Sequence, residues 1–393
     1  MKIFFSVGEP SGDQHAAHLI HELRQRRPDL EFEGYGGPLM ERAGCRLDFQ
    51  LTDLAVMGIW RVIPLLWRFL SLARMAGRMF RESPPDAVVL VDFPGFNWWI
   101  ARQAKAAGIP VFYYMPPQLW AWASWRVKKV RRFVDCVLSA LPFERDWYAE
   151  RGVTVDYVGH PFFDEVAQRI LDGEFIESLG GGGRRVVGVL PGSRDHEVSR
   201  CFPVMLEIIE ELTRRHANLR FAVACYKESH RAACGRMLAA RATRLPVELF
   251  VGRTSEVIEA AECCLMVSGS VSLELLARET PAAVMYRTDR ITYLIGRALV
   301  SCKFMSLPNL MAERAILPEY LIVGNPAAAT NAITGIVDGW LADGTLLSLT
   351  RRELKRLKSD VVAPGATSRA ATAILARMAS AMDAPAPAHR SAA

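Results

Sequence analysis

The feature that most constrains the fold is an alternation of fully apolar runs with helical patterns. In the first 160 residues these runs are KIFFSV, LEFEGYGG, DAVVLVDF, PVFYYM, DCVLSAL and VDYVGHP. Apolar strands separated by helices are typical of a parallel sheet covered on both faces. The alternation restarts as RVVGVLPGSR, RFAVACY, VELFVG, CCLMVSG and PAAVMYR. The sequence therefore predicts an α/β protein with two Rossmann-like, doubly wound domains that face each other across a cleft.

The length also supports two domains. The chain has 393 residues, whereas a single hydrophobic core stops growing at roughly 250 to 300 residues. Consecutive glycines at 180–183 interrupt the alternation, because glycine disfavours regular elements. We expect an N-terminal Rossmann-like domain over 1–165, a linker over 166–185 and a second Rossmann-like domain over 186–347. Helices over 348–382, able to pack back on the first domain, and a disordered tail over 383–393 should follow.

Composition limits the classes of partner. A net charge of +6 and a pI of about 8.9 favour anionic partners such as phosphates or an acidic lipid surface. The basic excess is too small to indicate nucleic-acid binding. The sequence has no DxD pair and no His/Cys cluster with metal spacing, and His160 and His196 stand alone. We therefore expect no metal and no other cofactor, and charge stabilisation by arginine and backbone N–H groups instead.

Cysteine usage and hydropathy indicate the compartment. The eight cysteines form no CxxC pair, and several lie in apolar runs such as ECCLMV, so we expect buried free thiols in a reducing cytoplasm. The N-terminus lacks a long apolar region followed by a cleavage site, and no run reaches the ~18 apolar residues of a membrane span. We expect neither a signal peptide nor a transmembrane helix.

Loops that follow strands carry the candidate chemistry, because doubly wound folds bind ligands at the carboxyl ends of their strands. GEPSGD, at 8–13, follows the first apolar run and opens a helix. Its glycines allow close backbone approach to a ligand, and the helix N-terminus offers free N–H groups. The alternative is that Ser11 or Asp13 only caps the helix.

VDFPGFN places Asp92 at the end of an apolar strand, with Asn97 shortly after it. Desolvation raises the pKa of a carboxyl at such a position, which makes it a better general base near neutral pH. The alternative is an aspartate that only holds the following turn by hydrogen bonds.

LPGSRDHEV, at 190–198, has the position in the second domain that GEPSGD has in the first. Gly192 and Ser193 predict a tight turn whose amides can hold phosphate oxygens, and Arg194 adds a guanidinium group. This favours a phosphate subsite over a surface turn with an unremarkable arginine.

VSGSVSLELLA, at 267–277, is a glycine- and serine-containing loop followed by a helix that carries Glu274. Loop amides can meet phosphate, while a carboxylate can accept hydrogen bonds from both hydroxyls of a ribose. Helix capping by Ser270 or Ser272 is the alternative.

The segment from Met57 to Phe80, MGIWRVIPLLWRFLSLARMAGRMF, mixes aromatic residues and leucines with arginines. Such a mixture is typical of an interfacial membrane anchor. The alternative is a helix packed on the sheet whose arginines form its wet edge. The side chains that we expect at a lipid surface are Trp60, Ile63, Leu66, Trp67, Phe69 and Leu70.

In this order, the motifs resemble those of the lipid-A-disaccharide synthases, glycosyltransferases of the GT-B fold. The resemblance covers nearly the whole chain: GEPSGD, GGPLMERAGC, DLAVMGI, VDFPGFN, PPQLWAW, LPFE, VGHP, LPGSR, VSGSVSLE and SLPNLMAERAILPEYL. It implies metal-free, inverting transfer of diacylglucosamine from UDP-2,3-diacylglucosamine to the 6′ hydroxyl of 2,3-diacylglucosamine 1-phosphate (lipid X). It also implies peripheral association with the inner membrane, and a homodimer is compatible with it.

The resemblance also implies residue roles. Asp92 matches the catalytic base, and Arg194 matches the arginine that stabilises the departing UDP phosphates. The residues expected to bind the UDP-sugar are Gly192, Ser193, Arg194, Ser268, Gly269, Ser270, Glu274 and Asn309. The residues expected on the acceptor side are Glu9, Ser11, Gly12, Asp13 and Asn97.

Departures from the family pattern concentrate in the N-terminal half. They are Pro10, Ala16, Arg61 and Gly95, together with PPQLWAW in place of SPSVWAW. The donor-side motifs are retained. Two other functions stay open at this point: another UDP-sugar-dependent GT-B enzyme, acting on a different lipid or as an epimerase, and a non-catalytic nucleotide-sugar or lipid-binding homologue.

Overall fold

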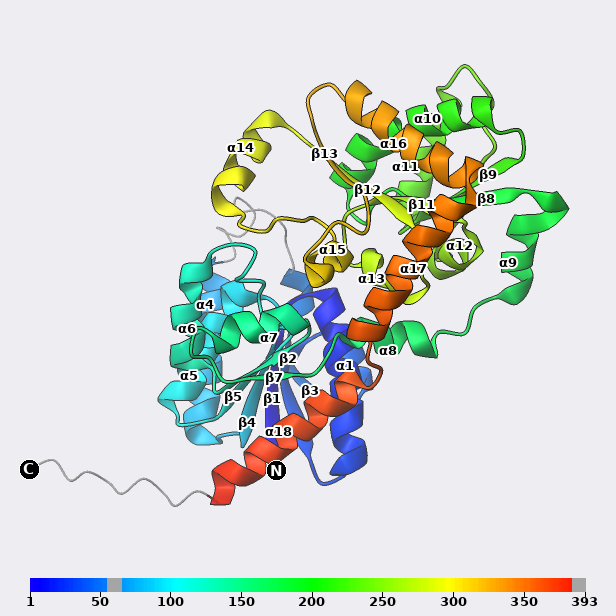
Figure 1. Ribbon diagram of the computed structural model, residues 1–393. Coiled ribbons are helices and arrows are strands. Elements are labelled where there is room, and N and C mark those ends of the chain that lie inside the picture. The colour runs from blue at the N-terminus through cyan, green and yellow to red at the C-terminus, as the bar shows by residue number, and fades with distance from the viewer. Residues whose placement is uncertain (55–65, 384–393) are drawn as a thin grey trace, which may run out of the picture. The chain divides into compact units, whose positions relative to one another are not determined.

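The computed structural model describes residues 1–54 and 66–383 and divides into two compact units (Figure 1). Unit 1 comprises residues 1–164 and the chain from residue 363 onward, and unit 2 comprises residues 165–362. Each unit contains one parallel sheet with helices packed on it. The predicted fold class, two doubly wound α/β units, is therefore confirmed.

Unit 1 is built on a seven-stranded sheet in the order β3-β2-β1-β4-β5-β6-β7. The order reverses between β1 and β4, which pair in parallel from Ile3 opposite Ala87 to Val7 opposite Val91. Ligands of such sheets bind at the carboxyl ends of the strands beside this switch point. The strands are β1 (Lys2–Val7), β2 (Glu31–Gly36), β3 (Arg46–Gln50), β4 (Ala87–Val91), β5 (Val111–Tyr114), β6 (Cys136–Ser139) and β7 (Val155–Tyr157).

Helices cover both faces of this sheet. Side chains alternate along a strand, so Phe4 joins the apolar cluster on one face and Phe5 joins the cluster on the other. The helices of unit 1 are α1 (Pro10–Arg26), α2 (Pro38–Arg42), α4 (Leu66–Glu82), α5 (Pro94–Ala106), α6 (Val127–Phe133), α7 (Pro142–Ala149) and α18 (Ala366–Asp383), with 3-10 turns η1 (Leu51–Leu54) and η3 (Ser124–Arg126). Helix α8 (Pro161–Gln168) spans the boundary to unit 2.

The C-terminal helix α18 belongs to unit 1, where it packs against α1. The Asp164 carboxylate accepts hydrogen bonds from the backbone N–H groups of Gly365 (2.6 Å) and Thr367 (3.0 Å) at the start of α18. Arg377 Nε donates to Asp156 Oδ2 at 2.8 Å further along the helix. Residues from both ends of the chain therefore build unit 1.

Unit 2 repeats the same topology with the strand order β10-β9-β8-β11-β12-β13. Its strands are β8 (Arg185–Leu190), β9 (Leu219–Cys225), β10 (Val247–Val251), β11 (Cys263–Val267), β12 (Ala282–Thr288) and β13 (Glu319–Val323). Its helices are α9 (Gly173–Gly180), α10 (Asp195–Arg215), α11 (Glu228–Ala239), α12 (Thr254–Ala260), α13 (Val271–Ala277), α14 (Arg290–Leu299), α15 (Leu307–Ala312), α16 (Ala327–Ala342) and α17 (Gly344–Val361), with the 3-10 turn η4 (Gly181–Gly183).

Two expected domain boundaries differ from the structure. The expected linker, 166–185, contains α9, which packs on α12 of unit 2 through contacts such as the ion pair of Arg253 with Asp172 (3.0 Å). Helix α17 also belongs to unit 2, so only α18 of the expected C-terminal helices packs on unit 1. The tail from residue 384 lies outside the described residues.

All eight cysteines are free thiols, and each is buried except Cys302, which is half-buried. Within residues 1–54 and 66–383, no helix combines the length and the apolar character needed to cross a membrane.

Candidate functional site

The β4–α5 loop contains the most unusual backbone of unit 1. Asp92 and Phe93 have φ angles of +48° and +46°, the left-handed region that residues with a side chain rarely adopt. Each such residue costs of order 1–3 kcal/mol and persists only where its surroundings hold it, often at a functional site. The Asp92 backbone oxygen accepts hydrogen bonds from Tyr113 Oη and Asn97 Nδ2, both at 2.8 Å.

Asn97 therefore holds the backbone of the loop. It is fully buried, and its Oδ1 accepts a hydrogen bond from the Ser6 hydroxyl of β1 at 2.7 Å. It was predicted on the acceptor side, but the structure gives it a positioning role beneath Asp92. Tyr113, which performs the same task from β5, is not among the residues predicted from the sequence. Its only sequence signal is its place in an apolar strand.

The Asp92 carboxyl is half-buried at the carboxyl end of β4. Desolvation raises its pKa above the ordinary value, while the hydrogen bond from the Phe93 N–H to Oδ1 (2.9 Å) and the nearby His15 oppose that rise. The ring of His160 lies 6.3 Å from that of His15, and burial lowers the pKa of His160 to about 3. His160 is therefore neutral, and its Nδ1 accepts the Phe162 N–H at 3.2 Å. The raised pKa makes this carboxyl a stronger proton acceptor than an ordinary aspartate.

Several GEPSGD residues serve to hold the fold together. The buried Asp13 carboxylate accepts hydrogen bonds from the N–H groups of Gly37, Leu39 and Met40, at 3.0–3.1 Å, and so caps α2. Gly8 leaves no room for a side chain because the Phe93 ring lies against it.

The remaining GEPSGD residues differ in exposure. Gly12 is buried, Glu9 is half-buried and Ser11 is exposed. Of these residues, Ser11 and Glu9 therefore present side chains beside the carboxyl ends of β1 and β4.

Helix α7 holds the loop after β5 in place by hydrogen bonds. Tyr148 Oη donates to the Pro117 oxygen at 2.8 Å, and Trp120 Nε1 donates to Glu144 Oε1 at 3.0 Å. Burial raises the pKa of the Glu144 carboxyl to about 7. The sequence reasoning missed Glu144, although it lies in the quoted LPFE motif.

In unit 2, the backbone amides of the LPGSR turn are bound by a carboxylate from the helix that follows it. The buried Glu197 carboxylate accepts hydrogen bonds from the N–H groups of Ser193 (2.9 Å) and Arg194 (3.1 Å) through Oε2. Its Oε1 accepts one from Arg194 Nη1 at 2.9 Å. The left-handed Gly192, φ +110°, leaves no room for a Cβ beside Glu197.

These contacts reduce the number of groups in this turn that can bind a phosphate. Because Glu197 already binds the amides of Ser193 and Arg194, these amides are not available to a phosphate as the sequence predicted. The half-exposed guanidinium of Arg194 and the exposed side chain of Ser193 are the groups of this turn that remain able to meet an anion.

The β11–α13 loop presents Gly269 and Ser270 to solvent, whereas Ser268 donates its hydroxyl to the Met305 oxygen at 2.7 Å. Glu274 is buried, and its Oε1 accepts a hydrogen bond from Arg278 Nε at 3.0 Å. Arg278 also pairs with Glu259 at 2.8 Å. An ion pair therefore already engages one oxygen of the carboxylate predicted to bind ribose.

Asn309 is fully buried and saturated by hydrogen bonds from within unit 2. Its Nδ2 donates to the Leu317 oxygen (2.8 Å) and to Glu319 Oε1 (2.7 Å), and its Oδ1 accepts the N–H groups of Ile316 and Leu317. Glu319 also accepts the N–H groups of Met305 and Ser306. Asn309 thus shapes the chain around α15, and it does so without presenting its amide at the surface.

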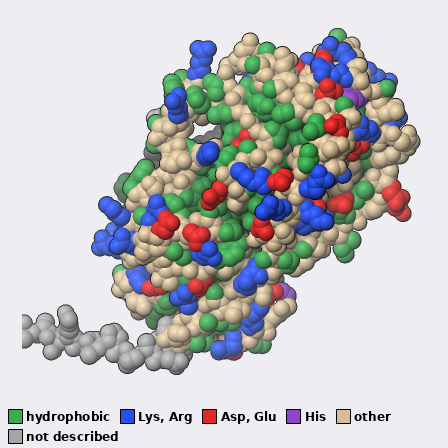
Figure 2. Space-filling model, in the orientation of Figure 1, with side chains coloured by type: hydrophobic (Ala, Val, Ile, Leu, Met, Phe, Trp, Pro, Cys, Tyr) green, Lys and Arg blue, Asp and Glu red, His purple; other side chains and the backbone are tan. Residues whose placement is uncertain are grey.

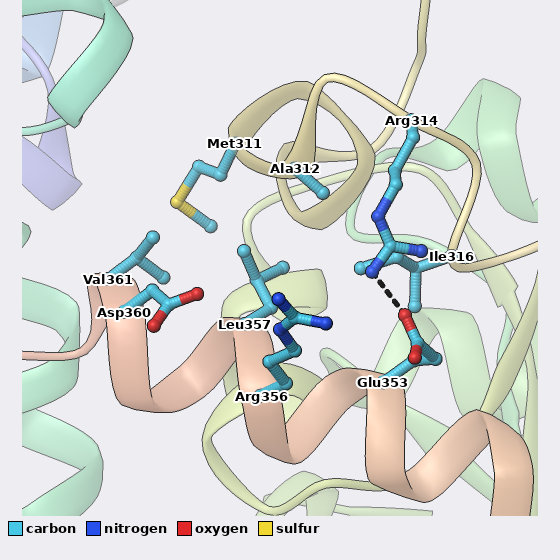
Figure 3. Close-up of a pocket in the computed structure, with 9 residues that line it drawn as sticks. All are labelled: Met311, Ala312, Arg314, Ile316, Glu353, Arg356, Leu357, Asp360 and Val361. Atoms are coloured by element: carbon cyan, nitrogen blue, oxygen red, sulfur yellow. Dashed lines mark hydrogen bonds and ion pairs between the residues drawn. The ribbon is translucent and has the colours of Figure 1, made fainter.

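A pocket of about 440 Å³ lies between α15, the segment after it, and α17 (Figure 3). In Figure 3 the guanidinium group of Arg314 points toward Glu353 of α17, with which it pairs, and Arg356 lines the pocket from α17 as well. The predicted nucleotide residues do not line this pocket. In the described part of the chain, no three His, Cys, Asp or Glu side chains are grouped as metal ligands.

The expected lipid-facing residues have different environments. Trp60 and Ile63 lie outside the described residues. On α4, Leu66 and Trp67 are exposed and Leu70 is half-buried. Phe69 corrects the expectation: it is buried, with its ring centroid 5.5 Å from that of Phe96. The helical repeat turns Phe69 toward the sheet and leaves Trp67 in solvent.

The chain matches the protein family described as lipid-A-disaccharide synthetase over residues 3–336. The lipid-A-disaccharide synthase of Anaeromyxobacter dehalogenans (strain 2CP-C) is 37% identical over 378 residues, which cover 96% of this chain and 97% of that protein. The lipid-A-disaccharide synthase of Azotobacter vinelandii is 38% identical over 323 residues, which cover 82% of this chain and 85% of that protein.

Solved structures share the fold. An S. aureus MnaA–UDP structure has a TM-score of 0.65 at 11% identity, with 98% of each chain covered. UDP-GlcNAc 2-epimerase from Neisseria meningitidis bound to UDP-GlcNAc has a TM-score of 0.63 at 11% identity, with 97% of this chain and all of that chain covered. At these identities the likeness shows the fold alone, which is of the GT-B class.

The contrast between Phe69 and Trp67 gives a prediction on stability. Phe69 is 7% exposed and Trp67 is 76% exposed. We expect Phe69→Ala to lower the free energy of unfolding by about 3–5 kcal/mol, because it leaves a cavity in the core. Trp67→Ala should change it by less than about 0.5 kcal/mol. Urea unfolding of both variants measures the difference, and equal losses would contradict the assigned helix orientation.

Proposed function

This chain belongs to the lipid-A-disaccharide synthase family, and we propose how its own residues carry out the family's reaction. The protein is a glycosyltransferase of lipid A biosynthesis that uses a nucleotide-sugar donor. We propose that the donor is UDP-2,3-diacylglucosamine and the acceptor is lipid X. The products are then tetraacyl lipid A disaccharide 1-phosphate and UDP.

The observation that carries the proposal for catalysis is the carboxyl of Asp92. As general base, Asp92 takes the proton of the acceptor hydroxyl while that oxygen forms a bond to the anomeric carbon. The bond from that carbon to the UDP oxygen breaks on the opposite side, so the anomeric configuration inverts. Support comes from the raised pKa of Asp92 and from its strained backbone, which Tyr113 and Asn97 hold in place.

Donor binding is proposed for unit 2. Arg194 stabilises the negative charge that develops on the departing UDP, since its guanidinium is half-exposed and only Glu197 pairs with it among the described acids. The exposed Gly269 and Ser270 supply further polar contacts. Glu197, Glu274 and Asn309 are proposed to shape these loops from within.

We also propose that the protein associates peripherally with an anionic bilayer, at which its lipid substrates reside. Helix α4 presents Trp67 and Leu66 to solvent, and a pocket of about 360 Å³ beside it is lined by Ser71, Arg74, Arg78, Arg81 and Gln103. Its three arginines pair with no described acid, so they suit phosphate groups. Donor, acceptor and bilayer are thus the proposed partners.

Removal of the proposed base tests the mechanism. We expect Asp92→Asn to slow transfer by about 10²–10⁴-fold, because no group then accepts the hydroxyl proton. UDP affinity should stay unchanged. Product formation from UDP-diacylglucosamine and lipid X gives the rate, with Asp146→Asn, on the exposed side of α7, as the control. Near-normal turnover by Asp92→Asn would exclude Asp92 as the base.

Arg194→Ala tests the donor side. Because a charged hydrogen bond contributes about 1.5–3 kcal/mol, we expect UDP affinity to fall by about 10–100-fold and transfer to slow with it. Titration calorimetry with UDP measures the affinity. Arg214→Ala removes an exposed arginine from the other end of the same helix and should leave binding unchanged. Unaltered affinity and rate in Arg194→Ala would remove Arg194 from the donor site.

Trp67→Ser tests membrane association without disturbing the core. We expect a smaller fraction of the protein to float with vesicles that contain phosphatidylglycerol, because an interfacial aromatic anchor is lost. Ile170→Ser removes an exposed apolar side chain elsewhere and serves as the control. Equal flotation of both variants and the unmodified protein would count against α4 as a membrane contact.

A further inference from the structure

Helix α14 of unit 2 has no buried residue, although its composition is strongly apolar. Ile291, Leu294, Ile295 and Leu299 are 72%, 63%, 56% and 49% exposed. Figure 1 shows α14, which follows β12 and precedes α15 in the chain, standing away from the sheet of unit 2. Figure 2 shows hydrophobic and Lys/Arg side chains together where α14 lies in Figure 1.

The spacing of these residues forms one apolar face. Positions 291, 294, 295 and 299 follow the i, i+3, i+4, i+8 repeat of a helix. Because successive residues are about 100° apart around a helix axis, Arg290 and Arg297 both lie along one border of that face. From 290 to 312 the chain contains Arg290, Arg297 and Lys303 but no Asp or Glu. The helix is therefore amphipathic and carries charge of one sign.

The helix needs a partner that the rest of unit 2 does not supply. It has ten residues, whereas isolated helices shorter than ~12–15 residues are marginal in water. Its N-terminus is secured, because Asp289 accepts hydrogen bonds from the N–H (2.8 Å) and hydroxyl (2.9 Å) of Thr292 and pairs with Arg200 of α10 at 3.1 Å. Its apolar face remains in solvent, which is unusual for a patch of contiguous large side chains.

We propose that α14 lies in the surface of an anionic bilayer, with its apolar face at the acyl boundary and Arg290 and Arg297 at lipid phosphates. This inference rests on the proposed membrane association and gives it a second contact, on the unit proposed to bind the donor. Apolar side chains bordered by arginines are suited to this interface, because the long arginine stems reach outward to the phosphates.

Charge and size favour a bilayer over a second copy of the chain. The absence of acids from 290 to 312 complements anionic lipid, whereas two such basic segments facing each other would repel. A ten-residue helix is only ~15 Å long, which is small beside the ~800 Å² that each partner buries in a stable interface. On a bilayer, by contrast, the helix needs only to insert its apolar face, as interfacial amphipathic helices do.

The test measures partition of the full-length protein onto vesicles of phosphatidylglycerol and phosphatidylethanolamine, and onto phosphatidylcholine alone. We expect Leu294→Ser/Ile295→Ser to bind the anionic vesicles at least tenfold more weakly. The control Leu346→Ser/Leu349→Ser changes two exposed leucines of α17 and should bind normally. Arg290→Gln/Arg297→Gln should weaken binding to the anionic vesicles and leave the phosphatidylcholine result unchanged.

A gain-of-signal variant reports insertion directly. The tryptophan fluorescence that Leu294→Trp adds should shift to shorter wavelength when anionic vesicles are present. Brominated acyl chains in those vesicles should quench it. Normal partition of Leu294→Ser/Ile295→Ser, or an unshifted Leu294→Trp spectrum, would overturn the proposal. So would a dimer in lipid-free sedimentation that this double variant converts to monomer, because the face would then bind a second copy.

Two further measurements separate this inference from the proposed function. The α14 variants should bind UDP normally and transfer detergent-dispersed substrates at the unmodified rate, since α14 belongs to neither proposed site. If Trp67→Ser loses flotation while Leu294→Ser/Ile295→Ser keeps it, the α14 contact fails and the membrane association through α4 stands. If the unmodified protein does not bind anionic vesicles, both fail.

Discussion

The structure of the proposed active site depends on how the backbone of Asp92 is held. Its carbonyl oxygen accepts hydrogen bonds from Tyr113 and Asn97, and the buried Asn97 also bonds to Ser6 of β1. The left-handed conformation of Asp92 and Phe93 costs of order 1–3 kcal/mol per residue. These hydrogen bonds offset that cost and keep the backbone in place. The strained turn sets the carboxyl at the end of β4, beside the switch point of the sheet. The position of the proposed base is therefore a property of three neighbouring strands.

Buried polar side chains organise the loops of both units in the same way. Asp13 caps α2, Glu197 binds the amides of the LPGSR turn, and Asn309 and Glu319 close the segments around α15. Each leaves few polar groups of its own for a ligand. The family motifs thus encode the shape of the loops as much as direct substrate contacts, and the groups left exposed, such as Arg194, stand out as the candidates for binding.

The apolar runs predicted the inner strands of both sheets and the edge strands β7 and β10, whereas β3 and β13 were missed. Both are edge strands with polar residues, RLDFQ and EYLIV, because an edge is only partly buried. The sequence located the loops that carry Asp92 and Arg194. It did not reveal that Glu197 occupies the neighbouring amides, or that Asp13 caps a helix about 25 residues away, because such partners are set by tertiary packing. Phe69 was expected at a lipid surface but is buried. In a segment this rich in apolar residues, the sequence does not show which side of the helix faces the core unless the first residue of the helix is known.

The pH dependence of kcat/KM tests the central claim most directly, namely that desolvated Asp92 is the base. The base must be ionised, so the rate falls as pH falls through the pKa of Asp92. Because burial raises that pKa, the account predicts an acidic limb at a pH above the ordinary aspartate pKa of ~3.9, and its loss from the residual activity of Asp92→Asn. An acidic limb that persists unchanged in Asp92→Asn would contradict the account.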